Sequence, residues 1–271
     1  MDNITIRDLL YSEVELIRYL QPKGWSDITF YFRMYTRCAF CYPIAAVQNS
    51  RIIGVATGIK NKDTGWVAHV IVSPNHYRHG IGQMLTEHVV KNLDSLGCKT
   101  QLLIATQMGE KLYEKLGFRT SGTYKFFKPK QIQVKKVSKN IRQLKYDERD
   151  EILALDEKIS GEFRKHMLEM FLKNGWIYID PDTNKIKGYF LQELGEGSII
   201  ATDEQGGTEL LEFKHHLGPM KTTIPDKNKT AEKFLLNNGF EEYQTAPRMV
   251  LGKEVDWKPE CVYSRIGGHY A

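Results

Sequence analysis

The chain has 271 residues, more than one compact core usually holds, so its length favours two domains of similar size. With 41% apolar and 26% charged residues and no long apolar run, the composition excludes a disordered chain and a membrane-spanning one. The net charge of +5 comes largely from six lysines without an acid between Tyr124 and Lys139. This stretch lacks the arginines and the groove-reading motif that favour specific nucleic-acid binding, so we interpret it as a solvated linker and expect no nucleic-acid partner.

Helical and strand patterns alternate through the first half of the chain. The patterns predict, in chain order, a strand within 4–10, helices over 12–20 and from 27 towards 41, paired strands over 43–47 and 51–59, a strand over 66–72, a helix over 81–93, a strand over 100–105 and a short helix over 109–115. The almost continuous apolar run 66–72 indicates a central strand covered on both faces. The predicted class is α/β around a mixed sheet.

Four cysteines are too few and too scattered for a disulfide framework, which fits a reducing compartment. Cys38 and Cys41 form a single CxxC with no second ligand pair, so we predict two half-buried thiols on a helix and no metal. The N-terminus carries charges where a signal peptide would need an apolar core. We therefore expect a cytoplasmic protein with no membrane partner.

The second half repeats landmarks of the first. RIIG, ending at Gly54, is echoed by KIKG, ending at Gly188, and KLGF around Gly117 is echoed by NNGF around Gly239. Two echoes in the same order indicate one fold used twice. We predict domains over 1–130 and 137–271.

The segment 70–85 carries the chemistry. A buried strand ends there, and a glycine-bearing turn opens directly into a helix, so that backbone N–H groups and the helix dipole face one point. Gly80 and Gly82 allow close approach of a pyrophosphate, and Arg78 and His79 add positive charge. The segment is neither a dinucleotide-binding fingerprint nor a Walker loop, since GxGxxG is incomplete and no Gly-Lys-Ser/Thr follows.

Val72 to Leu85, followed by Ala105 to Phe118, resembles the two signature motifs of the GNAT N-acetyltransferase superfamily. The resemblance covers roughly 4–127 and implies acetyl-CoA as the co-substrate. Three positions depart from the family pattern, with Tyr77 in place of Gln or Arg, Thr106 in place of Asn, and Gly109 in place of Ala. The residues implied are Tyr77, Arg78, His79, Gly80, Ile81, Gly82 and Gln83 for the pyrophosphate, and Val70, Ile71 and Val72 for a strand edge that pairs with the pantetheine arm.

The resemblance also implies direct transfer to a primary amine of a small molecule or peptide. Tyr113 matches the family tyrosine near the CoA sulfur and is the candidate general acid. His69 is the candidate base, acting directly or through water, and its alternative role is structural. Trp25, between the first two predicted helices, either contacts the acceptor amine or anchors the core.

The second half resembles the degenerate domain that follows the active one in a GNAT subfamily. Leu235 stands at the tyrosine position, and Asp203 and Glu204 stand where the phosphate loop should lie, so we expect no acyl-CoA binding there. The predicted fold is two tandem GNAT-like domains of the α/β (α+β) class, each with a mixed, mostly antiparallel central sheet flanked by helices. The sequence does not decide between a monomer and a homodimer. The alternative function is a non-catalytic acyl-CoA-binding sensor or interaction module.

Overall fold

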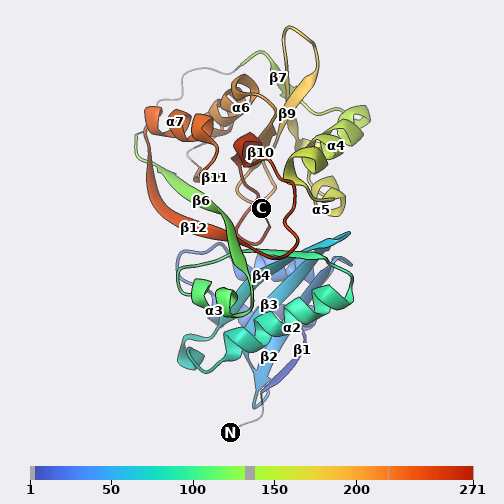
Figure 1. Ribbon diagram of the computed structural model, residues 1–271, viewed down its shortest axis with the longest axis vertical. Helices are drawn as coiled ribbons and strands as arrows, with labels where there is room; N and C mark the ends of the chain where they lie inside the picture. Colours follow the sequence, from blue (N-terminus) through green and yellow to red (C-terminus); the bar gives the residue numbers. More distant parts are fainter. Residues whose placement is uncertain (1–3, 132–137, 219, 271) are drawn as a thin grey trace.

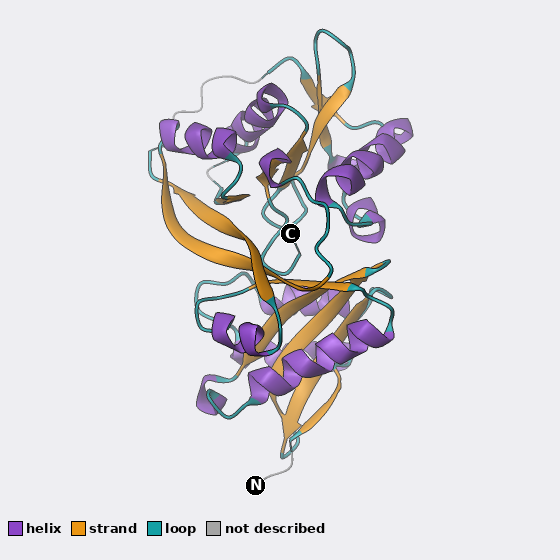
Figure 2. Ribbon diagram, viewed as in Figure 1, coloured by secondary structure: helices purple, strands orange, loops and turns teal. Residues whose placement is uncertain are grey.

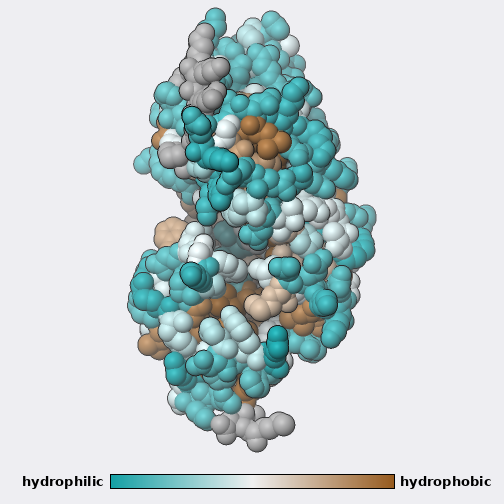
Figure 3. Space-filling view, turned by 90° about the vertical axis from the view of Figure 1, so that its left-hand side faces the viewer, coloured by the Kyte–Doolittle hydropathy of each residue, from teal (hydrophilic) through white to brown (hydrophobic). Residues whose placement is uncertain are grey.

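The structure is a computed structural model that describes residues 4–131, 138–218 and 220–270. Two lobes lie along the long axis, with the N-terminal end at the far tip of the first lobe and the C-terminal end between the two lobes (Figures 1 and 2). In the view of Figure 3, the surface is hollowed where the lobes meet. None of the described helices is both long and apolar enough to cross a membrane.

The first half forms the elements that the patterns predict, with shifts at their ends, and adds a 3-10 turn over 74–76 and a strand over 119–129 that were not predicted. In chain order these are β1 Thr5–Asp8, the 3-10 helix η1 Tyr11–Leu20, α1 Ile28–Tyr35, β2 Cys41–Gln48, β3 Arg51–Asn61, β4 Thr64–Val72, the 3-10 turn η2 Pro74–His76, α2 Ile81–Ser95, β5 Thr100–Ile104, α3 Glu110–Lys115 and β6 Arg119–Pro129. Because strand side chains alternate, Val55 faces η1 and α1 on one side of the sheet and Ala56 faces α2 on the other.

Two details of the first half correct the sequence prediction. The segment 12–20 is a 3-10 helix, and the helix after Asp27, whose side chain accepts a hydrogen bond from the Thr29 amide at 2.9 Å, ends at Tyr35. Cys38 and Cys41 therefore do not lie on a helix, since Cys38 follows the helix in a turn and Cys41 begins β2. Burial raises the pKa of the Cys41 thiol, as expected of an inert structural cysteine.

The second half repeats the pattern of strands, helix and strand. Its elements are β7 Ile141–Gln143, η3 Tyr146–Glu148, α4 Arg149–Ser160, α5 Lys165–Glu169, η4 Leu172–Asn174, β8 Trp176–Ile179, β9 Ile186–Leu191, β10 Ser198–Ala201, α6 Glu204–His216, β11 Thr222–Pro225, α7 Lys229–Asn237, β12 Phe240–Gly252, η5 Pro259–Cys261 and β13 Val262–Ser264.

The echoed glycines hold equivalent places in the two halves. A β-carbon on Gly54 would lie 3.0 Å from Leu85 of α2, and one on Gly188 would lie 2.9 Å from Leu210 of α6. Each glycine therefore lets a helix pack closely on its strand, which explains why the two sequences resemble each other there.

The sheets are shared between the halves in a way that the sequence did not predict. The larger sheet has the order β1-β2-β3-β4-β5-β12-β6-β11, and the smaller has the order β13-β10-β9-β8-β7. Strand β12 of the second half lies between β5 and β6 of the first, and β6 and β12 run side by side from one lobe to the other (Figure 1). Part of the predicted boundary, residues 132–137, lies outside the described residues.

The lysine-rich stretch is not a solvated linker throughout. Its first residues, up to Pro129, belong to β6, which is paired on both edges by β11 and β12. The Lys125 ammonium lies 2.5 Å from Glu232 and 3.2 Å from Glu242, and that of Lys128 lies 3.0 Å from Glu241. Acidic partners from the second half, 100 residues away in the sequence, therefore neutralise these lysines.

Candidate active site

The candidate site begins where two central strands part. Strands β4 and β5 are parallel and pair from Thr64 with Thr100 to Trp66 with Leu102. Beyond Trp66, β4 continues to Val72 along β3, whereas β5 pairs with β12. The edge of β4 over 70–72 that faces β5 therefore has no ladder partner among the described strands. A strand edge that pairs with a pantetheine arm would need to be free in this way.

A bulge in β4 sets the position of His69. The register with β3 shifts between Val55 and Thr57, and His69 has a φ of +46°, which is uncommon for a residue other than glycine. The His69 Nδ1 atom lies 2.8 Å from the hydroxyl of Tyr35, which is buried in α1. Burial raises the pKa of Tyr35 well above its ordinary value and, together with the nearby His269, lowers the pKa of His69 well below its ordinary value.

This hydrogen bond links the protonation of His69 to Tyr35. Tyr35 stays protonated, and its hydroxyl donates to Nδ1 of one neutral tautomer of His69 or accepts from Nδ1–H of the other. The other edge of the ring accordingly presents an N–H donor in the first tautomer and a basic nitrogen in the second.

The turn after β4 leads into an uncapped helix. Gly80 has a φ of +78° and occupies the N-cap position of α2 without a side chain to satisfy the first amides of the helix. A β-carbon on Gly80 would meet nothing within 4 Å, and one on Gly82 would meet only ordinary contacts, Leu112 at 3.7 Å and Val72 at 3.8 Å. Tyr77, Arg78 and His79 are exposed beside this open space. The arrangement offers backbone N–H groups and positive charge to an anion.

Tyr113 lies on α3, which follows β5. Its ring packs edge-on against Phe118 at 6.1 Å, and burial raises the pKa of Tyr113 to about 12. The Thr106 hydroxyl accepts a hydrogen bond from the Gly109 amide at 3.3 Å and so takes the capping role of the usual asparagine. Tyr113 is protonated at neutral pH and able to donate.

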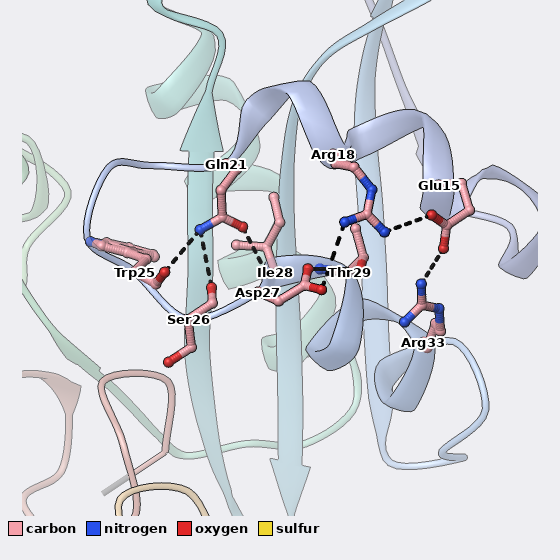
Figure 4. A network of polar contacts seen from close by, with 9 residues as sticks. All are labelled: Glu15, Arg18, Gln21, Trp25, Ser26, Asp27, Ile28, Thr29 and Arg33. Atoms are coloured by element: carbon pink, nitrogen blue, oxygen red, sulfur yellow. Dashed lines mark hydrogen bonds and ion pairs between the residues drawn. The ribbon is translucent and has the colours of Figure 1, made fainter. Parts of the chain in front are cut away.

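Trp25 lies in a loop held by a glutamine, as Figure 4 shows. The Gln21 side-chain amide donates to the carbonyls of Trp25 and Ser26, both at 3.1 Å, and its oxygen accepts from the Ile28 amide at 2.9 Å. The Trp25 side chain is 42% exposed, and its ring lies edge-on 5.9 Å from that of His69. The structure therefore brings these two predicted residues together and shows that Trp25 is not a core anchor.

The site also contains a residue that the sequence reading missed. His269, near the C-terminus, stacks on His69 with ring centroids 5.0 Å apart and lies 4.6 Å from the ring of Tyr31 in α1. The next residue, Tyr270, donates to Asn61 of β3 at 2.6 Å and fixes the segment there. Burial, with a contribution from Arg265, lowers the pKa of His269 to about 3. No motif marks the sequence GGHY, because its role depends on tertiary contacts alone.

Comparison with protein families agrees with these features. The acetyltransferase (GNAT) family model matches residues 7–118, and a second model, described as an acetyltransferase (GNAT) domain, matches residues 152–264. The chain belongs to the GNAT family. It carries two GNAT domains in tandem.

Several proteins resemble the whole GNAT pair rather than one domain. The uncharacterized N-acetyltransferase YitH of Bacillus subtilis is 23% identical over 209 residues, which is 73% of each chain. A putative acetyltransferase from Pyrococcus horikoshii superposes with a TM-score of 0.86 at 18% identity, over 100% of this chain and 97% of that one. A tandem GNAT protein from the clavulanic acid biosynthesis pathway gives 0.66 at 12% identity, over 94% and 100%. These structures share the fold.

The second GNAT domain caps the equivalent helix with a side chain of its own. The Asp203 side chain caps α6 by accepting from the Gly206 amide at 2.7 Å, so its own carboxylate holds the anion position. Gly207 is buried, and a β-carbon there would lie 2.1 Å from the Tyr263 ring. Leu235, at the tyrosine position, is fully buried in the core. Among the described residues of both domains, no group of three potential metal ligands converges.

Proposed function

We propose that the first GNAT domain transfers an acetyl group from acetyl-CoA directly to a primary amine of a small molecule or peptide. The observation that carries the proposal is the free edge of β4 over 70–72, which runs into the uncapped N-terminus of α2. Backbone groups of Val70, Ile71 and Val72 would hold the pantetheine arm. The segment 77–83 would hold the pyrophosphate, because its amides have no other acceptor from a capping side chain.

The co-substrate supplies the activated acyl group, and this chain supplies orientation and proton handling. Tyr113 would donate its proton to the departing sulfur, since its raised pKa keeps the hydroxyl protonated until the thiolate forms. The acceptor amine would bind against a wall of four aromatic rings, those of Trp25, Tyr31, His69 and His269. One of these four rings comes from the second half, which thereby contributes to the site of the first.

His69 remains the candidate base, acting directly or through water. In the tautomer whose Nδ1–H donates to the Tyr35 hydroxyl, the free Nε2 would take the proton of the amine or of its water. Replacing His69 by Gln keeps a hydrogen-bonding side chain without a basic nitrogen. We expect His69→Gln and His69→Ala both to lose about a hundredfold in kcat, with loss of the acid limb of the pH–rate profile. A His69→Gln variant that retains much of kcat would instead show that His69 only orients the acceptor.

Two measurements test the function. Titration with acetyl-CoA should raise the melting temperature, and failure to do so would exclude both an acyltransferase and an acyl-CoA sensor. Thiol release across a panel of primary amines then separates the two, because a sensor binds without turnover.

In Tyr113→Phe we expect unchanged acetyl-CoA affinity and a kcat lowered about a hundredfold, since only the proton donor is lost.

A further inference from the structure

A small cavity lies where the two lobes meet. Its volume is about 10 Å³, which is room for one water-sized guest. The polar residues of its wall are Tyr124, Ser160, Arg164, Ser198, Arg248 and Arg265. No carboxylate is among the described residues that line it, and the buried Glu162 and Glu196 lie outside the lining.

The three arginines differ in how their charges are matched. Arg164 pairs with Asp156 through two hydrogen bonds, at 3.0 and 2.5 Å. Arg265 donates from Nε and Nη2 to a single oxygen of Glu196, at 3.1 and 2.7 Å. Arg248 donates to the Ser121 hydroxyl at 2.8 Å and stacks on Trp257 at 4.3 Å, but no carboxylate of the described chain lies within ion-pair distance of it. The charge of Arg248 is therefore the one left uncompensated by a close partner.

Three buried donors around the cavity also lack hydrogen-bond partners among the described residues. They are the Tyr124 hydroxyl, Arg248 Nε and Arg265 Nη1, in side chains that are 0, 1 and 5% exposed. An unmatched buried donor is costly, and more so when it is charged. A guest that only accepts hydrogen bonds could satisfy all three at once. A water molecule could accept from only two of them, and its own hydrogens would have to bond hydroxyls of the wall such as those of Ser160 and Ser198.

We propose that this cavity binds a monovalent, monatomic anion of the size of chloride. The volume excludes phosphate, and two of the three unmatched donors belong to guanidinium groups, which favours an anion over water. The ion would link β6 through Tyr124, β12 through Arg248 and the C-terminal segment through Arg265. That segment continues to His269, so the anion would stabilise the contact between the second half and the candidate active site.

The proposal is tested by melting the full chain at constant ionic strength while gluconate is replaced by chloride. At chloride concentrations above the dissociation constant of the proposed site, each tenfold rise in concentration should raise the melting temperature of the wild type by about 2 °C. Tyr124→Phe removes one donor and Arg248→Met removes the unpaired charge, so both should lose most of this dependence. Tyr178→Phe, which changes a buried ring away from the cavity, should keep it.

Crystals grown in bromide give a second readout that does not depend on any variant. An anomalous peak within hydrogen-bond distance of Arg248 Nε and Arg265 Nη1 is expected. Should Arg248→Met fail to fold, Tyr124→Phe and the bromide crystals still decide. An ordered water without anomalous signal, or the same chloride dependence in wild type and Tyr124→Phe, would overturn the proposal.

Discussion

Gly82 is the residue at which the proposed pyrophosphate site can be altered with little change to the fold. A β-carbon there meets only ordinary contacts, the nearest at 3.7 Å, so Gly82→Asp should fold normally. Its carboxylate would face the phosphates, and we expect acetyl-CoA affinity, measured by calorimetry, to fall at least about tenfold. His88→Asp, an exposed position on the same helix, is the matched control and should bind normally. Unchanged affinity in Gly82→Asp would place the site elsewhere.

Buried histidines make stability depend on pH. Burial holds the pKa values of His269 and His215 at about 3, and that of His69 also lies well below its ordinary value. The unfolded chain takes up these protons below about pH 6.5, whereas the folded chain does not, so the free energy of unfolding should fall as the pH drops from about 6.5. Above that pH these histidines are neutral in both the folded and the unfolded chain, so they add nothing to the pH dependence of the free energy of unfolding.

Each such histidine contributes up to about 1.4 kcal/mol per pH unit below its unfolded pKa. Denaturant unfolding of wild type and His269→Gln between about pH 5 and 7, above the range of most carboxylates, isolates the effect. The free energy of unfolding of the variant should depend less steeply on pH than that of the wild type, by an amount that corresponds to about one bound proton. An equal slope would mean that His269 is not held neutral in the folded chain.

At the scale of single elements, local patterns predicted much of the fold. Helix α2, the hairpin of β2 and β3 and the central strand β4 each depend on residues close together in the sequence, so periodicity and turn residues suffice. The end of α1 at Tyr35 could not be predicted, because apolar spacing continues to Cys41, whereas the Arg37 amide bonds the Met34 carbonyl three residues back and so leaves the α-helical pattern. The bulge at His69 also escaped, since it depends on pairing with β3.

The equivalent helices α2 and α6 predict opposite responses to one added methyl group. Gly82→Ala should be tolerated, because the space beside it is open. Gly207→Ala should lower the free energy of unfolding by about 2 kcal/mol, because its β-carbon would overlap the Tyr263 ring, which is 2% exposed and unable to move freely. Thermal denaturation of the two variants checks this. Equal melting temperatures would contradict the view that the second domain has closed its ancestral anion site.

At the scale of the whole molecule, the position of β12 is what sequence reasoning could not supply. Its residues from Arg248 onwards pair with β5, and its residues up to Val250 pair with β6, both more than 100 positions away. An alternating strand pattern fits either sheet equally well, so the pattern cannot name the partner. His269 was missed for the same reason, whereas the motif residues 70–83 and Tyr113 could be predicted as site residues because each motif is contiguous.

The shared sheet and core predict that the two halves unfold together. One apolar cluster contains residues of both, including Trp66 and Tyr270. Between the halves, one Glu162 oxygen accepts from Asn61 at 3.2 Å and from Thr64 and Trp66, both at 2.9 Å. Calorimetry should therefore show one transition, with the two domains losing hydrogen-exchange protection at the same denaturant concentration.

Glu162→Leu tests this coupling directly. Three buried donors of the first half would lose their acceptor, so we expect a loss of about 3 kcal/mol in the free energy of unfolding, with a single transition retained at a lower temperature. Glu193→Leu, on the exposed surface, is the control and should melt near the wild type.

Two separate transitions in the wild type would show that the domains are independent, and the fragment 1–131 should then fold alone. With β12 absent from between β5 and β6, we expect that fragment to stay unfolded.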